Sequence, residues 1–248
     1  MDDRSTGSPF GDTLALLAQP AALLAGLVLA AAQLSRSYAM TTVVAQAQVN
    51  GNYRMLPFAS MAAGIVIFAV FAIVHFMLSR RLGGPEDSEG EPGIGNWIAM
   101  MFLYFLASQL VNFITPLMLR ISGTAITSYP YIMGGISLVL RLVFFPVMVF
   151  LAALAHDGEA CTFGDIWSFL TTRGVGWLLG YVLLAIAVTF IPVGLMSALT
   201  PRPGAVASGG MLISSLVIAA GQLLPILYAI AAYRAARASK GQGGPVSF

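Results

Sequence analysis

The sequence predicts an all-α membrane protein, a bundle of about six transmembrane helices with a short interfacial helix between spans four and five. The 248 residues are 58% hydrophobic and only 9% charged, with a mean hydropathy of +0.86. Charged residues make up about a quarter of an ordinary soluble domain. The apolar runs lack the two-residue alternation of barrel strands, and helices and closed barrels are the structures that satisfy their backbone in lipid.

Apolar runs of roughly 18 or more residues are typical of spanning helices, and six of them make residues 1–248 one polytopic membrane domain. Arg36 and the polar run Thr41–Asn52 follow the first run closely, so this helix could continue past the membrane before the turn signal Asn50-Gly51-Asn52. We place the spans at Thr13–Leu34, Leu56–Leu78, Trp97–Leu119, Ile132–Ala155, Val175–Leu199 and Met211–Tyr233.

The first run does not read as a cleaved signal peptide. Its leader, residues 1–12, carries three acids and one arginine, whereas the leader of a signal peptide is positive. Orientation follows from the basic residues of the short loops, which favour the cytoplasm. With six spans, one side holds seven of them and the other four, so we expect both termini to be cytoplasmic. The seven are Arg4, Arg80, Arg81, Arg173, Arg234, Arg237 and Lys240, and the four are Arg36, Arg54, Arg120 and Arg202.

A short motif recurs before three pairs of spans. Phe10-Gly11-Asp12 returns as Phe163-Gly164-Asp165, with a relative at Ile94-Gly95-Asn96. Each carries an Asp or Asn whose side-chain oxygen can cap a helix. The pattern suggests three helical hairpins, at residues 10–81, 94–155 and 163–234. Internal duplication explains it, and so does the general preference for capping residues at helix starts.

Arg141 is the one charged residue inside a predicted span. Inserting an arginine at the centre of a membrane helix costs about 2.5–3.5 kcal/mol on insertion scales. No carboxylate shares its depth. Its partners could be the amides of Gln109, Asn112 and Gln222, carbonyls released near Pro146, or a bound anion such as a lipid phosphate. Alternatively, the span starts near Ser137 and the side chain snorkels to the outer interface. The amides themselves are expected to bond between helices.

The segment Phe163–Trp177 predicts a short amphipathic helix on the cytoplasmic surface or tucked under the bundle. Its apolar residues can line one side, while Asp165 and the hydroxyl residues stay in water. Trp167 and Trp177 suit the headgroup layer, and Arg173 follows the segment. An ordinary loop with interfacial tryptophans is the alternative.

These residues carry a family resemblance. Arg141 with Pro146, Asp157-Gly158, Phe163 to Trp167, and Thr172-Arg173-Gly174 with Trp177 resemble a block of the YciC-like proteins. These are grouped with the membrane domain found beside some glycerophosphoryl diester phosphodiesterases. The resemblance covers roughly residues 130–200. It implies a bacterial inner-membrane protein linked to envelope upkeep, without catalytic residues. No phosphodiesterase domain accompanies this chain, so no hydrolase activity is implied.

Catalytic and cofactor motifs are absent from the sequence. The chain has two histidines and one cysteine, and it contains no HExxH, GxSxG or P-loop pattern. We expect His75 to be an interfacial side chain, and His156, Asp157 and Glu159 to be solvated rather than a metal or acid–base site. The acidic linker Gly83–Gly95 fits no EF-hand. The net charge of +2 and the lack of a basic stripe argue against nucleic-acid binding.

Two functional hypotheses remain. The first is a non-catalytic membrane protein, not an enzyme and without cofactor or metal, that binds lipids or other envelope proteins and supports envelope homeostasis. The second is a small transporter, because prolines interrupt four successive spans, as in the broken helices of transporters. The four are Pro116, Pro146, Pro192 and Pro225.

Overall fold

The computed structural model describes residues 8–84, 92–121, 129–158, 161–198 and 208–242, and in these ranges every regular element is a helix. Six are long, and two, α1 and α6, are short. The helices are α1 (Pro9–Leu17), α2 (Pro20–Asn50), α3 (Leu56–Leu82), α4 (Ile94–Ile121), α5 (Tyr129–Asp157), α6 (Phe163–Thr172), α7 (Val175–Ala198) and α8 (Ser208–Gln242).

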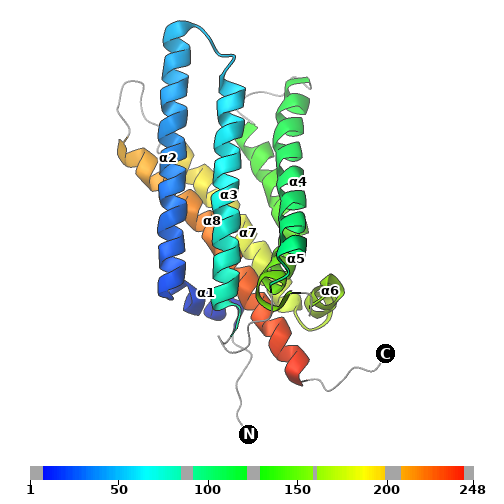
Figure 1. Cartoon of the computed structure of the whole chain (residues 1–248). Helices are drawn as coiled ribbons and strands as arrows, with labels where there is room; N and C mark the ends of the chain where they lie inside the picture. The colour runs from blue at the N-terminus through cyan, green and yellow to red at the C-terminus, as the bar shows by residue number, and fades with distance from the viewer. Residues whose placement is uncertain (1–7, 85–91, 122–128, 159–160, 199–207, 243–248) are drawn as a thin grey trace.

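The long helices run side by side, and α7 and α8 pass obliquely behind α2 and α3 (Figure 1). The short helices α1 and α6 lie across one end of the bundle, at the level where α3 and α5 end (Figure 1). In the described part of the chain, five helices are long and apolar enough to cross a membrane, and Ile94–Gln109 of α4 forms a shorter apolar stretch. The prediction of an all-helical membrane bundle is therefore confirmed.

The first long helix begins later than the predicted span at Thr13, and it continues to the Asn50-Gly51-Asn52 turn, as the sequence allowed. The chain breaks at Ala18 and Gln19, and Pro20 starts α2 at its first helical position, where a missing N–H costs nothing. This helix runs on to Asn50 and ends at Gly51, whose φ of 62° places it in the left-handed region. At 1.5 Å per residue, α2 is about 46 Å long, well beyond the ~30 Å hydrocarbon core.

Both copies of Phe-Gly-Asp lie in the first turns of the short helices, but the capping residue precedes the tripeptide. The hydroxyl of Ser8 accepts a hydrogen bond from the Gly11 N–H in α1. In α6, Thr162 and Asp165 form a reciprocal capping box, each side chain accepting from the other's backbone N–H. Each short helix then precedes two long ones, α2 and α3 or α7 and α8.

The core is centred on α5 and α8. Six consecutive residues, Leu151–His156, and eight consecutive residues, Ile226–Tyr233, are each at most 2% exposed. Burial on every side of a helix requires neighbours all round it, and α8 contacts α1, α2, α3, α5, α6 and α7. The densest packing therefore lies toward the end of the bundle that α1 and α6 cover.

Candidate functional site

Arg141 lies inside the bundle, near the middle of α5. It is twelve residues from the start of this helix at Tyr129, about 18 Å along the axis. Its Nη1 donates a hydrogen bond to the carbonyl oxygen of Gly221 in α8, over 3.2 Å. The side chain thus reaches across to a neighbouring helix, an arrangement that favours an interior position over snorkelling.

The acceptor is a carbonyl that proline has released. In an α-helix the N–H of residue 225 would bond to the carbonyl of residue 221, but Pro225 has no N–H. Pro192 removes the partner of the Val188 carbonyl in α7 in the same way. A Cβ built on Gly221 would lie 3.4 Å from that Val188 oxygen. The segments of α7 and α8 that each lack one backbone hydrogen bond therefore meet beside Arg141.

Among the described residues, the hydrogen-bond acceptor of Arg141 is the Gly221 carbonyl rather than one of the predicted amides. Gln222 instead accepts a hydrogen bond from the side-chain amide of the buried Gln33 in α2, over 3.1 Å. That contact is the bond between helices expected of an intramembrane amide. Gln109 is half-buried in α4, and the side chain of Asn112 lies outside the described residues.

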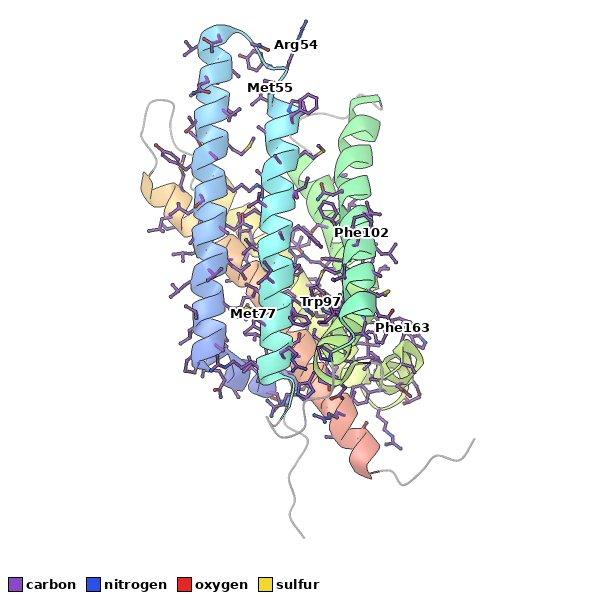
Figure 2. All side chains as sticks on the ribbon, in the orientation of Figure 1. Arg54, Met55, Met77, Trp97, Phe102 and Phe163 are labelled. Carbon is purple, nitrogen blue, oxygen red and sulfur yellow. The ribbon has the colours of Figure 1, made fainter. Side chains whose placement is uncertain are left out.

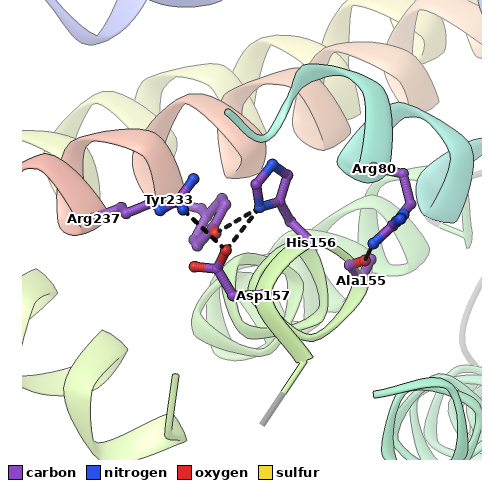
Figure 3. A network of polar contacts seen from close by, with 6 residues as sticks. All are labelled: Arg80, Ala155, His156, Asp157, Tyr233 and Arg237. Atoms are coloured by element: carbon purple, nitrogen blue, oxygen red, sulfur yellow. Dashed lines mark hydrogen bonds and ion pairs between the residues drawn. The ribbon is translucent and has the colours of Figure 1, made fainter. Parts of the chain in front are cut away.

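A second polar cluster occupies the covered end of the bundle (Figure 3). His156 is completely buried, and its Nδ1 lies 2.8 Å from Oδ1 of Asp157 and 3.2 Å from the hydroxyl of Tyr233. The guanidinium of Arg237 lies 3.4 Å from the same carboxylate oxygen. The prediction that His156 and Asp157 are solvated is wrong, because α8 supplies partners that cover them. Glu159 lies outside the described residues.

The turn after α3 closes over this network. A Cβ on Gly83 would overlap the imidazole of His156, and a Cβ on Gly84 would overlap the guanidinium of Arg237 and lie 3.0 Å from the same imidazole, so glycine allows this turn to lie against the ring. Arg80 donates to the carbonyl of Ala155. His75, about two turns before the end of α3, is also completely buried, 3.5 Å from the Ser79 hydroxyl and against the ring of Trp97. The His75 side chain therefore faces protein rather than the headgroup layer. Residues 85–91 of the acidic linker lie outside the described residues.

Helix α6 presents apolar side chains in two directions. Ile166 and Leu170 are buried against the bundle. Phe163, visible at the outer edge of the molecule in Figure 2, and Trp167 are 39% and 53% exposed, with their rings stacked. The short helix of residues 163–172 is the one expected from the sequence. Trp177 is 7% exposed and packs edge-on against Tyr228, so its ring faces the bundle.

Trp167 gives a direct test of whether α6 meets lipid. Trp97 and Trp177 are each 7% exposed, so lipid brominated near the headgroup should quench mainly the fluorescence of Trp167. The substitution Trp167→Phe should therefore remove most of the bromine quenching. Fluorescence in vesicles of brominated lipid measures this. Acrylamide, a quencher in water, is the control; strong acrylamide quenching of Trp167 without bromine quenching would place α6 in solvent.

No cluster of three or more His, Cys, Asp or Glu side chains that could hold a metal occurs in the described ranges. Cys161, at the start of α6, is a half-buried thiol. His156 is completely buried. Arg141 remains as a charged group at membrane depth.

No family model, curated protein or solved structure matches this chain.

Proposed function

We propose that this integral membrane protein is a non-catalytic component of the bacterial inner membrane that binds anionic lipid and supports envelope homeostasis. Both termini are proposed to be cytoplasmic, on the basic side of the chain. The resemblance of residues 130–200 to the YciC-like proteins supports the location and the role in the envelope. Other envelope proteins are further candidate partners. The anionic lipid is inferred as the ligand from the positive charge of Arg141 inside the bundle.

The uncompensated charge of Arg141 carries the proposal. The sequence has no Asp or Glu between residues 13 and 85, between 92 and 156, or after 165. No carboxylate therefore belongs to any of the six long helices away from the end that α1 and α6 cover. A second copy of the chain would bring none to this depth either. Intramembrane charges are normally paired, so the membrane is the nearest source of the missing anion, through lipid phosphate.

Replacing Arg141 with glutamine is expected to remove the co-purifying anionic lipid while the protein still folds. Glutamine keeps a donor for the Gly221 carbonyl but has no charge, so the fork that suits phosphate is lost. Native mass spectrometry of protein extracted in mild detergent measures the lipid. Arg54→Gln, at an exposed position in the α2–α3 turn, is the matched control. Unchanged lipid in the Arg141 variant would refute the proposal.

A small transporter is the second candidate. Pro146, Pro192 and Pro225 interrupt α5, α7 and α8, and two of the released carbonyls lie close to Arg141 or its acceptor. Broken helices that surround a charged residue near mid-membrane are typical of transport sites. Solute uptake into proteoliposomes separates the two functions, because a lipid-binding protein without transport activity gives none.

A further inference from the structure

Three side chains that can donate hydrogen bonds gather at one level of the bundle, from three different helices. Arg141 comes from α5, Tyr104 from α4 and Tyr181 from α7. Their positions follow from the sequence of α5, where Phe144 and Phe145 lie three and four residues after Arg141. Residues at these spacings share one face of a helix, so the two phenylalanines lie directly alongside the arginine.

Each phenylalanine holds one tyrosine. The ring of Tyr104 packs edge-on against Phe144, with centroids 5.1 Å apart, and also touches Phe68 and Phe71 of α3. Tyr181 is 3% exposed, and its ring stacks on Phe145 with centroids 4.0 Å apart and planes 14° from parallel. Rings fixed in this way keep their hydroxyls in place, because a tyrosine side chain has few rotatable bonds.

These ring contacts bring Tyr104 and Tyr181 alongside the part of α5 that carries Arg141. Nη1 of Arg141 is engaged by the Gly221 carbonyl, which leaves the edge formed by Nε and Nη2. Nε is buried and meets no acceptor among the described residues. A guanidinium edge presents two parallel N–H groups, the geometry that matches two oxygens of a phosphate.

We propose that Arg141, Tyr104 and Tyr181 form a binding site for a phosphate group, with the Nε–Nη2 edge of the arginine and the two hydroxyls as donors. This site rests on the proposed function and adds its ligand chemistry. A phosphodiester headgroup has two unesterified oxygens that share one negative charge, so it neutralises the arginine and accepts all of these bonds. A lipid headgroup and free phosphate share this chemistry.

The experiment uses full-length protein stripped of lipid in detergent. Phosphatidylglycerol is titrated in one arm and inorganic phosphate in the other, with binding followed by native mass spectrometry and thermal stabilisation. Tyr104→Phe and Tyr181→Phe remove one hydroxyl each and keep the ring packing. Each is expected to weaken binding about tenfold, as befits one hydrogen bond to a charged group. Tyr38→Phe, 72% exposed on α2, is the control and should bind normally.

Loss of binding in Arg141→Gln with unchanged binding in both tyrosine variants would overturn the three-residue site but leave the proposed function standing. Tyrosine-dependent binding of inorganic phosphate without binding of phosphatidylglycerol would support the site and refute lipid binding. Full binding by Arg141→Gln in both arms would overturn both. Tyrosine-dependent binding of phosphatidylglycerol supports both.

Discussion

Replacing His156 with alanine is expected to lower the free energy of unfolding by about 3 kcal/mol, the range seen when a large buried side chain is truncated. The imidazole is completely buried beneath Gly83 and Gly84, so its removal leaves a cavity. It also takes a partner from Asp157 and from the Tyr233 hydroxyl, and buried polar groups left unpaired cost about 1–3 kcal/mol. Unfolding by SDS in mixed micelles measures the change.

Arg173→Ala is the control for this experiment. Arg173 is exposed at the end of α6, and surface changes of this kind stay within about 0.5 kcal/mol. The effect of Tyr233→Phe should also be smaller in the His156→Ala background than in the wild type, because the two groups share one contact. If His156→Ala unfolds like the wild type, the histidine is not the centre of a packed network.

The second large effect is expected at Gly180, where α7 meets α8. A methyl group there would overlap the hydroxyl of Tyr228. The Tyr228 ring cannot move aside, because its hydroxyl donates to the Trp177 carbonyl over 2.9 Å and its ring contacts Phe145 and three other aromatic residues. Gly180→Ala should therefore destabilise the protein by about 2 kcal/mol, through overpacking and loss of the hydrogen bond.

Gly176→Ala is the matched control, one turn earlier in α7 and with no atom within 4 Å of the added methyl. It should be neutral or slightly stabilising, since alanine is the better helix former. Adding Tyr228→Phe to Gly180→Ala removes the clashing oxygen and should recover part of the loss. A Gly180→Ala protein as stable as its Gly176 counterpart would show that the two helices separate at little cost.

The apolar runs predicted the helices well because lipid leaves the backbone few alternatives. The same runs placed the limits of the first helix poorly, since hydropathy does not register a break within an apolar segment. Pro20 was the available signal, because proline favours the first helical position. Likewise, the four-residue offset from Pro225 to Gly221 marks a carbonyl without a helical partner, but the sequence does not show that Arg141, 80 residues away, reaches it.

The packing of the polar side chains could not be predicted from the sequence. His156 and Asp157 end an apolar run and precede a loop, a pattern typical of solvated residues. Their burial depends on Tyr233 and Arg237, which lie about 80 residues further along the chain. A single sequence does not show that such distant residues meet. The same reason applies to Tyr104 and Tyr181, which read as ordinary membrane aromatics until α4, α5 and α7 are assembled.

The central position of α8 has a consequence for biogenesis. This helix follows α1 to α7 in the chain, yet six of those helices pack against it. The earlier helices must therefore wait in the membrane with their inner faces uncovered until α8 is inserted. Quality-control proteases have access to those faces during that interval, so a nascent chain that stalls before Ile226–Tyr233 is exposed to degradation.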